Sequence, residues 1–115
     1  MSVFEFANLI AGESAYDIHV MSEHGGPISS SLEVSIDGES LQNCGFDTLI
    51  AGGSIGARKT SPALSSFLRD SGLPVRRVGS ICTGALVLAD AGILDGRRVT
   101  THWYVARELQ KTFRV

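Results

Sequence analysis

The stretch GSICTGALVLADAG, residues 79–92, joins an apolar run that ends at Ile81 to a helical pattern that begins just after Cys82. A strand that leads directly into a helix is the repeating unit of α/β proteins. In open parallel sheets, the joints at the carboxyl ends of the strands are where ligands and chemistry collect. The stretch therefore predicts both a fold class and a place for a site.

The rest of the chain shows the same alternation of strand and helix patterns. Turn residues and caps separate the segments, for example Gly12 after the first helix and Ser61-Pro62 at the start of the second. Helices are predicted over 3–12, 61–72, 83–92 and 103–113, and strands over 16–22, 28–37 (closed by an Asp37-Gly38 turn), 46–53, 76–82 and 97–102.

This order of elements predicts an α/β fold in which helices cover both faces of a parallel sheet. Residues 1–115 are expected to form one domain. Such domains usually open on a buried strand, whereas this chain opens on a helix and closes just after another. We therefore expect the domain to be incomplete at both ends, without its first strand and its carboxyl-terminal part.

Composition excludes several classes of protein. Hydrophobic residues make up 43% of the chain and charged residues 19%, which is typical of a globular protein. The net charge of −2 provides no basic field for nucleic acid or an anionic membrane. No membrane span or secretory signal is recognised, so a cytoplasmic location is expected. Cys44, Cys82 and the three histidines lack metal-ligand spacing, and neither a metal nor a cofactor is expected.

A cysteine at the joint suits nucleophilic chemistry. Amide groups at the start of a helix stabilise a thiolate, and the amide of Thr83 is free to bind an oxyanion. The pair Gly52-Gly53 could supply a second donor, although a plain turn explains it equally well. A cysteine at the end of an apolar strand is more often a packing residue, which is the alternative for Cys82 and the interpretation of Cys44. His102 is a base, a hydrogen-bonded structural histidine or a helix cap. Ile81 is expected to be buried.

The segment VGSICTGALVLADAGILDGRRVTTHW, residues 78–103, together with the upstream TLIAGG, resembles the ThiJ/PfpI superfamily. This resemblance implies a flavodoxin-like fold, the one shared by class I glutamine amidotransferases. It implies that Cys82 is the reactive cysteine, that Gly53 and Thr83 provide oxyanion-hole amides, and that His102 is the histidine near the cysteine.

Two positions depart from the pattern of that superfamily. Many members place an acidic residue of the first helix against the cysteine, where this chain has Ser2 and, one turn away, Glu5. In protease-like members a histidine follows the cysteine, where this chain has Thr83. The resemblance therefore does not imply proteolysis.

Two branches of the superfamily share the CTGALVL core. VFEFAN, LPVRRVGSICTGA and LDGRRVTTHWYVARELQKTF most resemble the amino-terminal domain of AraC-family transcription regulators. That branch implies a domain that senses a small molecule, forms a homodimer and leaves DNA binding to a helix-turn-helix domain outside these residues. The alternative is a stand-alone cysteine-dependent enzyme such as an isonitrile hydratase.

Overall fold

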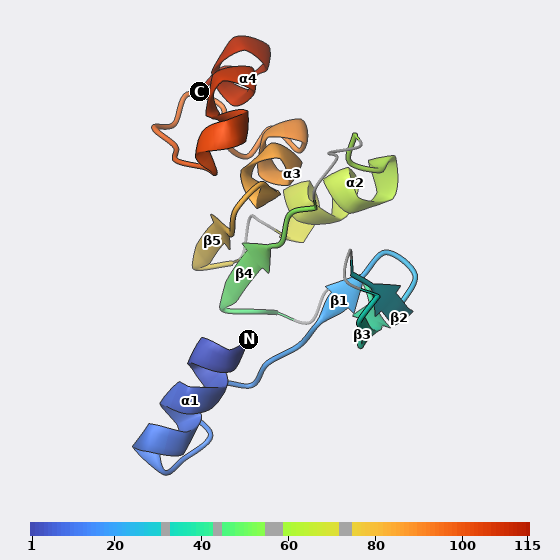
Figure 1. Ribbon diagram of the computed structural model, residues 1–115, viewed down its shortest axis with the longest axis vertical. Coiled ribbons are helices and arrows are strands. Elements are labelled where there is room, and N and C mark those ends of the chain that lie inside the picture. Colours follow the sequence, from blue (N-terminus) through green and yellow to red (C-terminus); the bar gives the residue numbers. More distant parts are fainter. Residues whose placement is uncertain (31–32, 43–44, 55–58, 72–74) are drawn as a thin grey trace. The chain divides into compact units, whose positions relative to one another are not determined.

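A computed structural model describes residues 1–115 except 31–32, 43–44, 55–58 and 72–74. The chain divides into two compact units, residues 1–40 and 41–115. Each unit combines α-helical and β-strand structure (Figure 1), so the α/β class predicted from the sequence is confirmed. None of the helices in the described ranges is long and apolar enough to cross a membrane.

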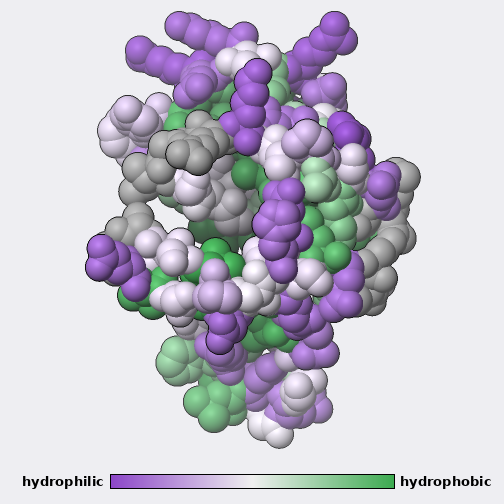
Figure 2. All heavy atoms as spheres, turned by 90° about the vertical axis from the view of Figure 1, so that its right-hand side faces the viewer, coloured by the Kyte–Doolittle hydropathy of each residue, from purple (hydrophilic) through white to green (hydrophobic). Residues whose placement is uncertain are grey.

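The first unit opens on helix α1, Ser2–Ala11, which confirms the predicted helix. Gly12 ends it with a left-handed φ of 69°, and its amide donates to the carbonyl oxygen of Asn8 at 3.0 Å. No residue of α1 is buried, and most of its large apolar side chains (Val3, Phe6, Leu9 and Ile10) are exposed. Apolar side chains appear as green spheres at the bottom of Figure 2.

A small mixed sheet completes this unit. It contains β1 (Met21–Ser22), β2 (Gly26–Ser29) and β3 (Ser35–Ser40) in the order β1-β3-β2, with β1 parallel and β2 antiparallel to β3. The predicted strand over 16–22 is thus present only at its end.

The single strand predicted over 28–37 is wrong, because the chain folds there into a hairpin. The amide of Ser30 donates to the carbonyl oxygen of Val34 at 2.9 Å, and Glu33 adopts a left-handed φ of 59°. Since the turn is made here, Asp37-Gly38 does not form one and instead lies within β3. A Cβ on Gly38 would lie 2.7 Å from Cδ1 of Ile28 on β2, so this glycine allows the two strands to pair closely.

The second unit contains the parallel pair predicted from the sequence. Strand β4 (Thr48–Ala51) pairs with β5 (Arg77–Ser80), and Ala51 lies opposite Ser80. Helix α2 (Pro62–Ser71) connects them, and the amide of Leu64 donates to the side-chain oxygen of Ser61 at 3.1 Å. Ser61 is therefore the predicted cap, whereas the predicted end at Gly72 lies outside the described residues.

Two apolar clusters hold α3 (Gly84–Asp90) in place. One joins it to the inner face of β4 and to α2, and the other joins its opposite side to α4 (Trp103–Thr112). The buried members are, in the first cluster, Leu49, Ala51, Leu68, Leu88 and Ala91 and, in the second, Leu86, Ala89, Val105 and Leu109.

Helix α3 ends at Asp90, close to Gly92, whose φ is 75°, as the sequence predicted. Two details of this unit differ from the prediction. Residues 97–102 form no strand, because no described strand pairs with them. The described helices α2 and α3 both pack on the face of β4 that carries Leu49 and Ala51, whereas Ile50, on the other face, is 41% exposed. Among the described residues of this unit, helices therefore do not cover both faces of the strand pair.

Candidate functional site

Cys82 lies at the turn between β5 and α3, as predicted. Its backbone φ is 57°, in the left-handed region that side chains other than glycine, asparagine and aspartate rarely adopt. Its side chain is exposed. Backbone strain of this kind persists only where the surrounding structure imposes it, and it concentrates at functional sites. The packing alternative for Cys82 therefore loses its main support, since the thiol is not in the core.

The carbonyl oxygen of Cys82 is held by the segment that precedes α4. The side-chain hydroxyl of Thr101 donates to it at 2.9 Å, and the amide of His102 donates to it at 3.4 Å. These two donors explain how residues 97–102 remain in place without a strand partner. They also bring His102 to the cysteine, although it is 20 residues later in the sequence.

The loop after β4 packs tightly against the same turn. The hydroxyl of Thr83 donates to the carbonyl oxygen of Ser54 at 3.1 Å. A Cβ on Gly53 would collide with Oγ1 of Thr83 and with the amide nitrogen of Gly84, and a Cβ on Gly84 would collide with the carbonyl oxygen of Ala51. Close backbone approach therefore requires glycine at 53 and 84, and Gly53 and Thr83 lie together as the sequence suggested.

His102 caps helix α4. Its ring Nδ1 accepts a hydrogen bond from the amide of Tyr104 at 3.3 Å. A nitrogen that accepts is unprotonated, so in the neutral ring the proton is on Nε2. In this arrangement the ring presents a donor at Nε2 rather than a base, and the capping interpretation left open by the sequence applies.

Sequence reasoning missed the exposed apolar residues beside the turn. Ile81, expected to be buried, is 61% exposed, and Trp103 and Tyr104 are 78% and 76% exposed. The rings of His102 and Trp103 lie 5.4 Å apart and those of Trp103 and Tyr104 5.9 Å apart. The consecutive letters HWY in the sequence were the available signal. We call His102, Trp103 and Tyr104 the aromatic cluster.

Other predicted positions lie elsewhere. Ser2 and Glu5 are in α1, within the first unit, and Cys44 lies outside the described residues. Within the described part of the chain, no three histidine, cysteine, aspartate or glutamate side chains are grouped so that they could hold a metal ion.

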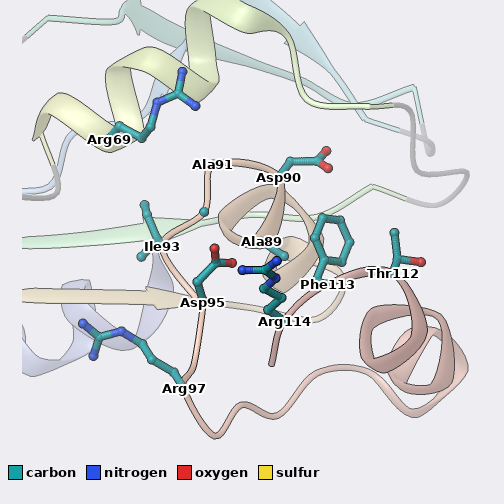
Figure 3. A pocket seen from close by; sticks show the side chains of 11 residues that line it. Arg69, Ala89, Asp90, Ala91, Ile93, Asp95, Arg97, Thr112, Phe113 and Arg114 are labelled. Carbon is teal, nitrogen blue, oxygen red and sulfur yellow. The ribbon is translucent and has the colours of Figure 1, made fainter.

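A cavity of about 790 Å³ in the second unit contains none of these site residues. Figure 3 shows Arg69 above it, Arg97 below it, and Asp95 and Arg114 between them. The carboxyl ends of α2, α3 and α4 contribute to its lining, and helix carboxyl ends carry partial negative charge. The partial negative charge at the end of α2 explains Arg69, and acidic Asp90 and Asp95 also line the cavity, so the cavity does not indicate a ligand class.

Comparison with known proteins assigns the chain to a family. The model of the DJ-1/PfpI family matches residues 3–114. The chain belongs to the DJ-1/PfpI family. It is similar to a crystal structure of a putative transcriptional regulator protein from Vibrio parahaemolyticus, with 28% identity and a TM-score of 0.78. That match covers 97% of this chain and 62% of the other.

Curated relatives of this DJ-1/PfpI domain fall in both of the expected branches. The HTH-type transcriptional regulator CdhR of Pseudomonas aeruginosa is 38% identical over 102 residues, 85% of this chain and 30% of the regulator. The isonitrile hydratase of Pseudomonas putida is 29% identical over 100 residues, 84% of this chain and 44% of the enzyme. The resemblance to AraC-family regulator domains is confirmed, and the chain spans less than half of either protein.

Proposed function

We propose that this DJ-1/PfpI domain is the small-molecule-sensing domain of an AraC-family transcription regulator, with Cys82 in its binding site. The observation that carries the proposal is the left-handed backbone of the exposed Cys82, fixed through its carbonyl oxygen by Thr101 and His102. The similarity to HTH-type regulators supports sensing in preference to turnover.

The ligand is a small nitrogenous molecule, such as an amide, which contacts the thiol of Cys82. Amide groups of Gly53 and Thr83 are the donors for its carbonyl oxygen, in the manner of an oxyanion hole. His102 adds the Nε2–H donor that follows from its capping contact. Thr83, the residue after the cysteine, provides no imidazole for proton transfer, which favours binding over catalysis.

The test combines binding with chemistry at the thiol. A panel of small amides and isonitriles is screened for an increase in melting temperature and for protection of Cys82 from iodoacetamide, followed by peptide mass spectrometry. We expect Cys82 to react faster than Cys44 without ligand and to be protected by ligands that raise Tm. Equal rates at the two cysteines would argue against a site at Cys82.

The alternative function is a cysteine-dependent hydratase, and the isonitrile hydratase match favours it. In that case the sulfur of Cys82 bonds to the isonitrile carbon, which also takes up the thiol proton, and a thioimidate forms. Water then adds to that carbon, the nitrogen takes up a proton, and cleavage of the C–S bond releases the formamide and restores the thiol. NMR distinguishes the two functions. A sensor leaves an alkyl isonitrile unchanged over hours, whereas a hydratase converts it to the formamide, and the Cys82→Ser variant does not.

The proposal includes the partners of the domain. A regulator acts in the cytoplasm, and DNA contact belongs to a helix-turn-helix domain outside these residues. This chain is therefore proposed to form a homodimer and to show no duplex affinity. Light scattering tests the first statement and a salt-dependent DNA titration the second.

A further inference from the structure

Trp103 is an exposed aromatic residue beside the proposed site. Its ring contacts that of His102, and the amide of His102 donates to the carbonyl oxygen of Cys82. Two further exposed apolar or aromatic residues belong to this region, since Tyr104 packs edge-on against Trp103 and Ile81 directly precedes Cys82. Large apolar side chains grouped in solvent are a feature of binding sites.

The fold does not account for the exposure of Trp103. Helix α4 is fixed to α3 through its other face, by Val105 and Leu109, which are 5% and 2% exposed. Trp103 contributes nothing to that cluster. The aromatic cluster is therefore available for contact with a ligand without any change in how α4 is held.

The side chains of the aromatic cluster favour an uncharged ligand. The indole presents an apolar face, and His102 presents a polar Nε2–H at one side of it. Residues 98–107 carry Arg98 and Arg107 and no carboxylate. With Glu108, the next residue, this segment still carries one more cationic than anionic side chain, which disfavours a cationic ligand, whereas a hydrocarbon group would have an apolar surface to cover.

We infer that Trp103 is a specificity-determining residue of the Cys82 site, and that it recognises the hydrocarbon part of an uncharged alkyl amide. The inference rests on the proposed function and adds the ligand class to it. The polar end of the amide lies at Cys82 and the Nε2–H of His102, and its alkyl chain lies on the indole.

The chain contains a single tryptophan, so its fluorescence reports on this position alone. The chain is titrated with acetamide, butanamide and hexanamide, and each amide is also assayed for protection of Cys82 from iodoacetamide. We expect a blue shift in emission and an affinity that rises by up to about fourfold for each methylene that becomes buried.

Variants separate recognition from folding. Trp103→Ala should abolish the dependence of Cys82 protection on chain length, and Trp103→Phe should retain most of it, because phenylalanine preserves an apolar ring. Arg107→Ala, one turn further along the exposed side of α4, is the matched control and should behave as the unaltered chain. Circular dichroism melts check that each variant folds.

The outcomes distinguish this inference from the proposed function. If the amides protect Cys82 equally whatever their length, the role of Trp103 is overturned and the sensing proposal stands. If tetramethylammonium shifts the fluorescence and protects Cys82 as well as hexanamide does, recognition is of charge and the inference is wrong. If no amide protects Cys82 but another ligand of the panel does, the inference falls and the sensing proposal stands. If no ligand of the panel protects Cys82, both proposals fall.

Discussion

The hydroxyl of Thr83 donates a hydrogen bond to the carbonyl oxygen of Ser54, 3.1 Å away, and so joins the loop after β4 to the turn that carries Cys82. The two residues are 29 positions apart in the sequence. This contact makes the geometry of the turn depend on the neighbouring strand as well as on its own backbone.

Replacing Thr83 by valine removes the hydroxyl and keeps the shape of the side chain. The carbonyl oxygen of Ser54 loses its partner, and we expect the free energy of unfolding to fall by about 1 kcal/mol. Thr83→Ser keeps the donor and should remain within about 0.5 kcal/mol of the unaltered chain. Urea titrations of the three proteins measure both differences, and equal losses would show that the contact does not stabilise the turn.

The glycine pair after β4 allows a matched comparison. A Cβ on Gly53 would collide with Thr83 and Gly84, whereas a Cβ on Gly52 meets nothing within 4 Å. We expect Gly53→Ala to lower Tm and to change the rate at which Cys82 reacts with iodoacetamide, because the turn must shift. Gly52→Ala should leave both unchanged. Similar behaviour of the two variants would contradict the close packing described here.

Ile81, expected from the sequence to be buried, is exposed, whereas Leu88 of α3 lies in the core. Ile81 is 61% exposed and Leu88 2% exposed. Ile81→Asp should therefore fold with a change in stability of about 1 kcal/mol or less. Leu88→Ala should lose about 2–5 kcal/mol through the cavity it leaves. Thermal melts decide, and a variant Ile81→Asp that fails to fold would restore the buried assignment.

Asp47 links β4 to β5 electrostatically. Its hydrogen bonds with Arg76, at 2.6 and 2.8 Å, and with Thr48 lower the pKa of this carboxyl to about 2. Because this pKa lies below its ordinary value of 3.8, the stabilisation is present above that value and is lost as the pH falls towards 2. The stability difference between the unaltered chain and Asp47→Asn should shrink over this range.

The control for this experiment is Asp70→Asn, a change at an exposed carboxylate of α2. The free energy of unfolding of Asp70→Asn should differ less from that of the unaltered chain at neutral pH than the value for Asp47→Asn does, and the difference should change less as the pH falls. A constant difference for Asp47→Asn down to pH 2 would mean that the arginine contact does not contribute to folding stability.

His19 gives the first unit the opposite dependence on pH. Its ring nitrogens lie 2.9 Å from a carboxylate oxygen of Glu39 and 3.2 Å from one of Asp17, and these hydrogen bonds raise its pKa above 6.5. The stabilisation is therefore complete below pH 6.5 and is lost as the pH rises through the raised value. Unfolding experiments between pH 5 and 9 should show that Glu39→Gln destabilises the chain mainly on the acid side.

Local signals predicted the helices well, because capping residues next to a helix mark where it begins or ends. Gly12 ends α1 and Ser61 caps α2, and both act through neighbours within four residues. The joint at Cys82 was predicted for the same reason, since strand, cysteine and helix follow one another directly. Its left-handed backbone was not, because it depends on contacts with Ser54 and Thr101 that no local pattern contains.

Long-range pairing explains the predictions that failed. Residues 97–102 have the alternation of a strand, but a strand exists only where another strand accepts its hydrogen bonds. Asp37-Gly38 has the composition of a turn, but the turn had already formed at Ser30 and Val34. The exposure of Trp103 depends on which side of α4 faces α3. All three depend on partners that are distant in the sequence.

The left-handed backbone at Cys82 creates a trade-off between folding stability and thiol reactivity at this position. A residue with a Cβ in this conformation loses roughly 1–2 kcal/mol relative to glycine. A mutational scan of position 82 ranked by thermal resistance should therefore place glycine above cysteine. The same scan ranked by thiol-dependent binding should place cysteine first. At this position, selection for thermal stability alone would replace the cysteine and so eliminate the proposed site.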